Sequence, residues 1–462
     1  MEKKKYGLIT AITMIVGIVI GSGIFFKSDN ILIYTNGSIE KGIVVFSIAA
    51  IGIIFGSLTI GVLASKTTAA GGIITYADEY SGRKVACGFG WFLSFVYFPA
   101  LVAVLAWVTG VYICMLFGIE ATTKTLLYLS VISVVICFFV NTVSTKLGGY
   151  YQNISTFIKI IPLFLMAVAG LIYGDPKLIV NETTIKLGEQ SGTWLAALGP
   201  VAFSYDGWVV STSIAHELKN SKKTLPLALT IGPIFVLVAY ILYFVGISIL
   251  VGPEEIMRLG DEHLNVAALK IFGKNGAKVI LTFIVVSVTG TLNGFILGFI
   301  RLPYSLALRK MLPFSSEIEK VDKRTGVSKI SAIFAIVVSI VWIWLNYITQ
   351  KYNMLPNSDV SEIPIVASYI LYIILYFNVI KLYKKGEVPS FIKGVIIPIL
   401  AIIGSSIIVI GGLQNPMTIY YLIICSIVIK KIKAFFDFFL YFFLHIFNCV
   451  TIILFLYFPH SF

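Results

Sequence analysis

Three glycines and a serine lie within an apolar segment near the start of the chain, in the sequence Gly17-Ile-Val-Ile-Gly21-Ser22-Gly23-Ile-Phe. Glycine adopts non-helical dihedral angles at little steric cost, so this segment can interrupt a helix inside a membrane. The backbone N–H groups after the break could then bind a carboxylate, with the Ser22 hydroxyl as a further donor. A second interpretation stays open, because Gly17 and Gly21 also form the G-x-x-x-G pattern of closely packed helices.

A second interruptible segment follows in the other half of the chain, in the sequence Leu198-Gly-Pro-Val-Ala-Phe-Ser-Tyr-Asp206-Gly207-Trp. A Gly-Pro pair stands early in this apolar run, and an Asp-Gly pair stands near its middle. Paired interruptions at corresponding positions of two halves are typical of transporters built from inverted repeats. The two segments together favour interrupted helices over close packing alone.

Asp206 places a carboxyl group inside the second segment, where an uncompensated charge costs several kcal/mol. Two partners are open to it. The carboxylate can accept the N–H groups of a half-helix that begins at Gly207, as the N-cap of a helix does. It can instead lie near the ammonium group of a substrate, beside the carbonyl groups that end the first half-helix.

Lys159 is a lysine within an apolar run, in the sequence Phe157-Ile-Lys-Ile-Ile-Pro162. Its ammonium group could extend to the cytoplasmic interface, as lysines near helix ends do. We favour the alternative, in which the lysine is buried, faces the helix bundle and braces the interrupted helices. Such a lysine could also carry a proton.

Membrane-spanning helices must position these residues, because the chain is 58% hydrophobic and only 12% charged, far from the composition of soluble domains. A helix of about 20 residues crosses the hydrocarbon core. Stretches of this kind predict twelve spans, at residues 8–35, 42–64, 85–117, 125–142, 147–173, 193–216, 225–251, 276–308, 330–348, 363–380, 394–412 and 416–430.

The residues between the spans, and the motifs that the sequence lacks, exclude several classes of protein. The longest polar connections, 65–84, 174–192, 252–278 and 309–329, are too short for a soluble domain, and no GxxxxGK[ST] loop occurs. Five cysteines form no C-x-x-C pair, and four histidines form no H-E-x-x-H motif, so we expect no metal site and no other cofactor. We therefore expect neither an ATP-driven pump nor an enzyme.

The basic residues predict the orientation of the spans, because lysine and arginine are retained on the cytoplasmic side. With the N-terminus inside, 23 of them fall in cytoplasmic segments and 10, including Lys27, fall in external ones. This bias and the anionic lipid of the cytoplasmic face account for the net charge of +13 without any nucleic acid partner. We expect a multi-pass protein of the cell membrane, with both ends of its helical core in the cytoplasm.

Five motifs, in the same order and in comparable spans, give the chain a resemblance to the amino acid/polyamine/organocation (APC) superfamily. They are Gly21-Ser-Gly-Ile-Phe25, Gly71-Gly-x-x-x-Tyr76 with Gly82, Phe203-Ser-Tyr-Asp-Gly-Trp208, His216-Glu-Leu-Lys-Asn220, and Gly290-Thr-Leu-Asn-Gly294 through Arg301. Within this superfamily the chain resembles the L-type amino acid transporter (LAT) branch, in particular bacterial serine/threonine exchangers. The resemblance covers about residues 5–430.

The resemblance implies an all-α polytopic membrane protein with the LeuT-type fold. Two inverted five-helix repeats, at about 8–173 and 193–380, would be followed by two further transmembrane helices within a transporter domain of residues 1–430. Residues 431–462 form an atypical hydrophobic tail, since residues 434–462 hold 10 of the 34 phenylalanines. We assign no function to this tail.

The resemblance also implies a substrate-binding role for particular residues. Phe203 would be the aromatic gate over the substrate. Ser204, Asp206 and Gly207 would form the wall that receives the α-amino group, and Asn293 would lie near the side-chain pocket. The α-carboxylate would be held by the segment Val19, Ile20, Gly21, Ser22, Gly23 and Ile24.

The expected function is secondary active transport of amino acids by alternating access. Lys159 matches a coupling position where sodium-coupled relatives hold a sodium ion, so the resemblance favours an exchanger or a sodium-independent carrier of neutral L-amino acids. Two alternatives stay open: a membrane amino-acid sensor that does not transport, and a proton-coupled symporter of another small amine.

The expected partners are the amino acid substrate and membrane lipid. Eukaryotic members of the resembled branch bind a single-span glycoprotein through a disulfide from the loop after span three. In this chain residues 118–124 contain no cysteine, so we expect no disulfide-linked ancillary subunit.

Overall fold

The structure is a computed structural model, and it describes residues 7–21, 23–67, 72–179, 193–209, 221–322, 325–355, 358–414, 422–423 and 425–426. Within these residues every regular element is a helix and no strand occurs. In this part of the chain nine helices are long and apolar enough to cross a membrane, and a bent pair near the N-terminus makes a tenth span if it is counted as one. The prediction of an all-α polytopic membrane protein is confirmed.

The described residues of the first half of the chain form nine α-helices, a π-helical turn and a 3-10 turn. They are α1 (Leu8–Val19), α2 (Gly23–Phe26), α3 (Ser28–Tyr34), α4 (Ile39–Lys66), α5 (Ile73–Ser81), α6 (Arg83–Phe92), the π-helical turn η1 (Leu93–Tyr97), α7 (Phe98–Phe117), α8 (Thr123–Val143), α9 (Thr145–Tyr173) and the 3-10 turn η2 (Pro176–Ile179). Helices α6, η1 and α7 join into one long span, Arg83–Phe117.

The second half repeats the alternation of short and long helices. It comprises the 3-10 turn η3 (Trp194–Ala197), α10 (Leu198–Ser204), α11 (Ser221–Val251), α12 (Pro253–Leu259), the 3-10 turn η5 (Gly260–Glu262), α13 (His263–Leu308), α14 (Ser315–Ile318), α15 (Lys329–Lys351), α16 (Glu362–Lys384), the π-helical turn η6 (Ile392–Ile396) and α17 (Ile397–Leu413). The predicted sixth span is described through residue 209 only, and most of the predicted twelfth span, 416–430, lies outside the described residues.

Polar residues begin several of these helices. The side chains of Ser38, Thr122, Ser144 and Ser328 each accept a hydrogen bond from a backbone N–H in the first turn of the helix that follows. Such N-caps satisfy donors that a helix start otherwise leaves free. At the other end of α7, Gly118 has φ of 67°, a left-handed conformation that stops the helix.

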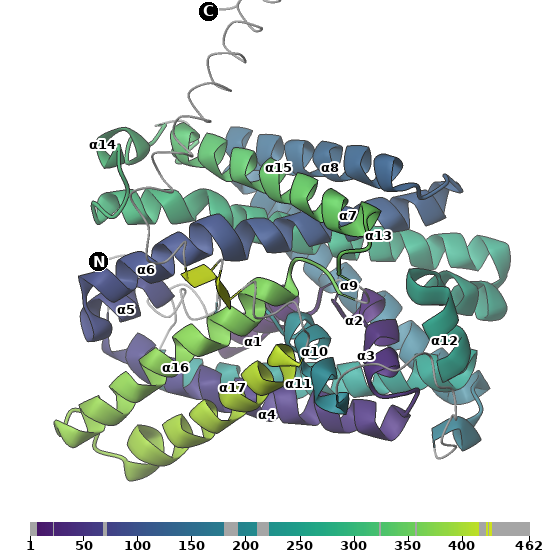
Figure 1. Ribbon diagram of the computed structural model, residues 1–462, viewed down its shortest axis with the longest axis horizontal. Coiled ribbons are helices and arrows are strands. Elements are labelled where there is room, and N and C mark those ends of the chain that lie inside the picture. The colour runs from purple at the N-terminus through teal and green to yellow at the C-terminus, as the bar shows by residue number, and fades with distance from the viewer. Residues whose placement is uncertain are drawn as a thin grey trace, which may run out of the picture.

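The short helices α2 and α10 lie in the middle of the bundle, and long helices surround them (Figure 1). Helix α11 packs against α1, α4 and α9, while α13 packs against α7, α9 and α15. Helix α10 contacts α2, α4, α16 and α17. The two interrupted spans are therefore enclosed on several sides by complete helices.

Two long helices present a broad apolar face to the surroundings. Exposed side chains on α8 are Tyr128, Ile132, Val135, Ile136, Phe139 and Val143. Exposed side chains on α9 include Ile154, Phe157, Ile161, Leu165 and Val168. Monomeric soluble proteins rarely expose a continuous apolar surface of this extent, whereas membrane helices present such a surface to lipid.

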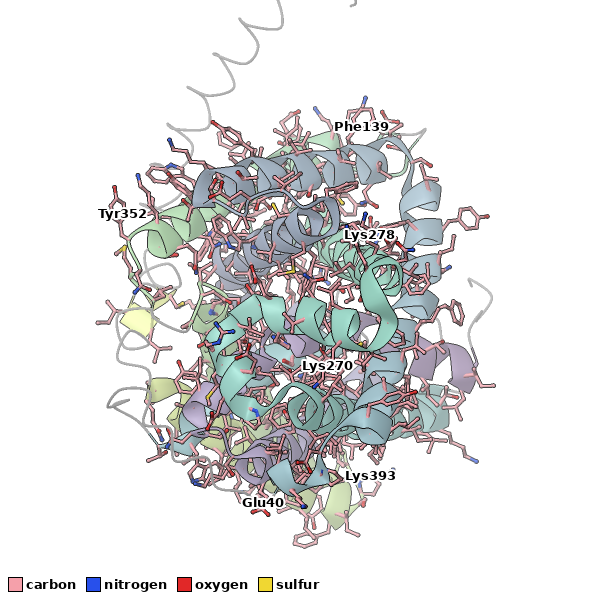
Figure 2. The ribbon with its side chains drawn as sticks, turned by 90° about the vertical axis from the view of Figure 1, so that its right-hand side faces the viewer. Glu40, Phe139, Lys270, Lys278, Tyr352 and Lys393 are labelled. Atoms are coloured by element: carbon pink, nitrogen blue, oxygen red, sulfur yellow. The ribbon has the colours of Figure 1, made fainter. Side chains whose placement is uncertain are left out.

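A kink marks the predicted start of the eighth span. Helix α13 runs from His263 to Leu308, but Gly273, with φ of 63°, interrupts its helical dihedral angles, so the part after the kink starts close to the predicted residue 276 and ends at the predicted residue 308. The predicted polar connection 252–278 therefore contains α12, η5 and the first turns of α13. Figure 2 looks onto this end of the bundle, where Lys270 and Lys278 are labelled.

Candidate functional site

The first span is interrupted where the glycines predict a break. Helix α1 ends at Val19, Ile20 has an extended backbone with φ of −67° and ψ of 105°, and α2 begins at Gly23. Ser22 lies outside the described residues. The break leaves the last carbonyl groups of α1 without the helical partners they would otherwise have.

The sixth span is interrupted as well. Helix α10 ends at Ser204, and Tyr205 and Asp206 continue in a turn. Gly207 has φ of 95°, and a Cβ atom at this position would lie 2.7 Å from Cγ2 of Ile18. Both the dihedral angle and the lack of space therefore require glycine here, next to the last turn of α1.

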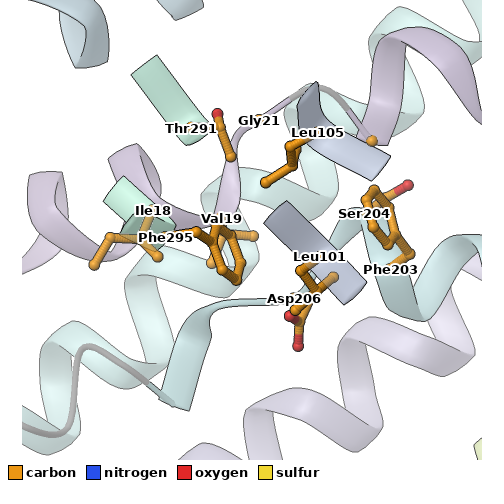
Figure 3. A pocket seen from close by; sticks show the side chains of 11 residues that line it. Ile18, Val19, Gly21, Leu101, Leu105, Phe203, Ser204, Asp206, Thr291 and Phe295 are labelled. Carbon is orange, nitrogen blue, oxygen red and sulfur yellow. The ribbon is translucent and has the colours of Figure 1, made fainter. Parts of the chain in front are cut away.

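A small pocket lies between the two breaks, with about 270 Å3 of space not occupied by atoms, a volume that includes open solvent. Figure 3 shows side chains from both interrupted spans around it, together with side chains from α7 and α13. The residues that line the pocket are Ile18, Val19, Gly21, Gly23, Leu101, Leu105, Phe203, Ser204, Asp206, Thr291 and Phe295.

Six of the predicted substrate-binding residues line this pocket, namely Val19, Gly21, Gly23, Phe203, Ser204 and Asp206. Ile20 and Ile24 are fully buried beside it and are not among the lining residues. Gly207 is also buried and is not among the lining residues, but it shapes the turn after Asp206. The structure thus brings residues of two segments about 180 positions apart to one cavity.

The glycines of the first span also allow close packing, so both interpretations of this motif describe part of the structure. A Cβ atom at Gly17 would lie 2.3 Å from Cγ2 of Thr156 on α9. A Cβ atom at Gly21 would lie 2.9 Å from Cγ2 of Thr291 on α13. The two glycines face different helices, so the motif does not form one G-x-x-x-G seam.

Tyr240 joins the two breaks. Its buried hydroxyl lies 3.0 Å from the carbonyl oxygen of Val19 and 2.9 Å from that of Ser204. These are the last carbonyl groups of α1 and α10. A phenol has one proton, so it can donate to only one of the two carbonyls at a time.

We expect Tyr240→Phe to reduce transport about tenfold, because it leaves a buried carbonyl without its donor at a cost of about 1–3 kcal/mol. The measurement is initial uptake per amount of folded protein in vesicles. Tyr243→Phe is the matched control, since Tyr243 is a buried tyrosine on the same helix whose hydroxyl has no partner within the described residues. Equal uptake by both variants would contradict this role of Tyr240.

The carboxylate of Asp206 accepts a hydrogen bond from the hydroxyl of Tyr97, with Oη and Oδ2 2.5 Å apart. Tyr97 is the last residue of the π-helical turn η1, a type of distortion that occurs often at functional sites. The backbone of Gly207 also donates to the Asp206 carboxylate. The half-helix predicted to begin at Gly207 would include residues from 210 on, and residues 210–220 lie outside the described residues.

Lys159 is fully buried and faces the bundle. Its ammonium group donates a hydrogen bond to the carbonyl oxygen of Gly17, 2.8 Å away. That carbonyl belongs to the last turn of α1, where the helix dipole is negative and a cation is stabilised. The lysine therefore contacts the interrupted span directly and does not extend to an interface.

Asn293 lies away from the pocket, in contrast to its predicted place beside the substrate side chain. Its amide nitrogen donates to the carbonyl oxygen of Gly148 at 3.1 Å and to Oε1 of Gln152 at 3.2 Å. Its amide oxygen accepts from Asn141 at 2.7 Å. Successive helical residues are about 100° apart, so position 293 points away from the face of α13 that carries Thr291 and Phe295.

The side-chain wall of the pocket contains residues that were not predicted to bind substrate. Leu101 and Leu105 come from α7, outside all five motifs, and Thr291 and Phe295 come from the motif on α13 that predicted Asn293 instead. In each pair the residues are four positions apart, so they share one helix face. This spacing is the signal available in the sequence, but helices that are apolar all round show many such pairs.

Lys27, which the distribution of basic residues places on the external side, is buried inside the protein. Its side chain is 1% exposed and lies between α2 and α3, where it forms ion pairs with Asp359 and Glu362. Asp29, in the next turn, is a further buried acid that the sequence did not single out. Burial of Lys27 is possible because two carboxylates compensate its charge.

Comparison with known proteins identifies the family. The family model described as amino acid permease matches residues 6–429. The chain belongs to this family. The permease is 32% identical over 410 residues to the serine/threonine exchanger SteT of Bacillus subtilis (strain 168), a match that covers 87% of this chain and 90% of the exchanger.

More distant relatives of the permease include animal transporters. It is 28% identical over 309 residues to the b(0,+)-type amino acid transporter 1 of Mus musculus, covering 63% of this chain and 60% of that protein. It is 24% identical over 399 residues to the cystine/glutamate transporter of Homo sapiens, covering 84% and 77%. The permease is therefore an amino acid transporter of the APC superfamily and not an enzyme.

Proposed function

We propose that this permease exchanges small neutral L-amino acids across the cell membrane by alternating access, without sodium. The observation that carries the proposal is the pocket between the two interrupted spans, which combines uncovered backbone groups with an apolar wall. In transporters with such a central site, one part of the helix bundle moves relative to the other and opens the site to each side of the membrane in turn.

The backbone of the two breaks offers groups for both ends of an amino acid. The α-carboxylate would lie against the N–H groups between Val19 and Gly23, where Ser22 stays a predicted further donor. The α-ammonium group would lie near the carbonyl groups that end α10 and near Asp206. Ser204 and Asp206 line the pocket at this place, so opposite charges of substrate and site would face each other.

The remaining wall favours an uncharged side chain. Leu101, Leu105 and Phe295 are apolar, and Thr291 adds one hydroxyl. A cationic or anionic side chain buried among these residues would lack a partner, which costs several kcal/mol. The name of the serine/threonine exchanger SteT agrees with a small neutral substrate, for which the Thr291 hydroxyl could provide a polar contact.

Competition measurements test this selectivity. Uptake of radiolabelled L-serine into vesicles should be inhibited by excess L-serine, L-threonine and L-alanine. L-Lysine and L-glutamate at the same concentration should inhibit at least about tenfold less, because their charges would be buried unpaired. Equal inhibition by charged and neutral amino acids would contradict the selectivity for neutral side chains.

We also propose an arrangement for the whole chain. Residues 1–430 would form the transporter domain, with inverted repeats at about 8–173 and 193–380, because an interrupted span stands at the start of each. Both ends of this domain would lie in the cytoplasm, as the distribution of lysine and arginine predicts. The loop between α7 and α8 offers no cysteine, which supports transport without a disulfide-linked subunit.

A further inference from the structure

A buried group of three charged side chains lies close to the pocket, and we call it the Lys27 cluster. The ammonium nitrogen of Lys27 is 2.8 Å from Oδ2 of Asp359 and 3.0 Å from Oε1 of Glu362. The lysine side chain is 1% exposed, whereas the two carboxylate side chains are 11% and 10% exposed. The acids therefore stand at the rim, and the lysine lies beneath them.

The lysine also contacts the aromatic rings that cover the pocket. Its ammonium nitrogen lies 5.2 Å from the ring centroid of Phe26 and 5.5 Å from that of Phe203. The two rings pack edge to face, with centroids 5.5 Å apart. Phe203 lines the pocket, so Lys27 lies between the carboxylates and the aromatic cover, at the distance of a cation–π contact.

Three spans meet at this cluster. Lys27 connects α2 with α3 in the first span, Phe203 belongs to α10, and Glu362 is the first residue of α16. Helix α10 approaches the cluster a second time, since a Cβ atom at Gly199 would lie 3.3 Å from Oε2 of Glu362. Opening the pocket at this end requires these spans to separate, and separation would break the ion pairs.

The electrostatics suit a contact that opens and closes. Removing charges from water costs free energy that their attraction inside the protein only partly returns, so a buried ion pair contributes little net stability. When the cluster opens, water can hydrate the same charges again. The cluster contains one ammonium group and two carboxylates, and Asp29 and Asp261 lie close enough to interact with Lys27 electrostatically. The acids therefore outnumber the lysine, and this excess of acidic groups favours hydration.

We propose that Lys27 is a positioning residue of the transport cycle, which holds Phe203 over the pocket by joining the first, sixth and tenth spans. The cluster closes the end of the bundle where α3 and α12 lie, and it must open before a substrate can pass there. This role rests on the proposed transport function. A cluster with only a structural role would stabilise every conformation of the protein. Its loss would then not change access to the pocket from one side of the membrane alone.

Thiol labelling at the pocket tests this role without measuring transport. Thr291→Cys is introduced into a background without the native cysteines, and a membrane-impermeant thiol reagent is applied to either side of the vesicles. In this background Lys27→Met should increase the labelling rate at least about fivefold from the side of α3 and α12, because the population open to that side grows. Labelling from the opposite side should stay the same or fall.

Three further variants make the result specific. Lys27→Arg keeps the charge and should label at close to the rate of the parent protein. Exchanging the charges in the double variant Lys27→Glu with Glu362→Lys should restore slow labelling in part. Lys351→Met is the matched control, since Lys351 also lies over two aromatic rings, 5.7 Å and 5.1 Å away, but is exposed.

The outcomes separate this inference from the proposed function. A labelling rate in Lys27→Met that is unchanged, or raised equally from both sides, would overturn the role of Lys27 even if amino acids are transported. Faster labelling from the side of α3 and α12 alone supports it, including in a protein that fails to transport any amino acid tested, whereas faster labelling from the opposite side alone would overturn it. If Lys27→Met does not fold, Glu362→Gln must give the same one-sided increase.

Discussion

Replacing Gly23 by alanine is expected to reduce transport at least about tenfold, since overpacking costs about 1–3 kcal/mol. A Cβ atom at this position would lie 2.7 Å from Cα of Ser204 and 3.1 Å from Cδ1 of Phe203. The Ser204 atom belongs to the backbone, so the contact cannot be relieved by rotating a side chain. The two interrupted spans would have to move apart, which changes the geometry of the pocket that Gly23 and Ser204 both line.

The measurement for Gly23→Ala is initial uptake per amount of protein that elutes as a single species from size-exclusion chromatography. Gly149→Ala is the matched control, because Gly149 is a helical glycine of α9 with no heavy atom within 4 Å of an added Cβ. The control should transport like the parent protein. Uptake by Gly23→Ala at the parent rate would show that the two breaks need not approach this closely.

Replacing Lys159 by alanine is expected to reduce transport roughly 10- to 100-fold, because a hydrogen bond to a charged group contributes about 1.5–3 kcal/mol. The ammonium group of Lys159 is fully buried and donates to Gly17 in the last turn of α1. Without it, the negative end of this half-helix loses its cation, and the contact between α9 and the interrupted span loosens.

The same reasoning predicts that sodium is dispensable. A buried ammonium group and a sodium ion would compete for the same oxygens, and repulsion forbids both together. Uptake by the parent protein should be unchanged when sodium is replaced by choline. Lys41→Ala, at an exposed lysine of α4, is the control and should transport normally. A strict sodium requirement, or parent-level uptake by Lys159→Ala, would refute the coupling role of Lys159.

The helices and their interruptions could be predicted because their signals are local. Apolar runs of sufficient length define the spans, and Gly21, Gly23 and Gly207 mark the breaks through their own backbone freedom. The burial of Lys159 against a partner could also be predicted, since a charge within an apolar run needs a compensating group wherever it lies. Its actual partner, the Gly17 carbonyl, is 142 residues away and has no signature in the sequence.

The pocket wall and the Lys27 cluster could not be predicted, because they depend on which helix faces meet. Leu101 and Leu105 lie in a helix that is apolar on all sides, so nothing distinguishes a pocket-facing leucine from one facing lipid. Lys27 stands at the end of an apolar run, where it resembles a loop residue. It is buried only because chain positions more than 330 residues away supply its two carboxylates.

Two further residues show how tertiary contacts decide a role. Tyr97 and Tyr240 are ordinary aromatic residues of apolar helices, yet the first donates a hydrogen bond to Asp206 and the second lies within hydrogen-bond distance of both broken helix ends. Asn293 is the opposite case. It lies within a family motif that predicts a place near the substrate, but its position on α13 directs its amide to Asn141 and Gln152 and away from the pocket.

The most direct test of amino acid exchange is uptake of radiolabelled L-serine into vesicles that contain the purified permease. Vesicles are loaded with unlabelled L-serine or left empty, and both are assayed in choline buffer. We expect internal L-serine to accelerate the initial uptake at least about fivefold, because an exchanger returns to the outside faster with substrate bound. Absence of L-serine uptake in both preparations, or equal uptake with and without internal L-serine, would contradict the account.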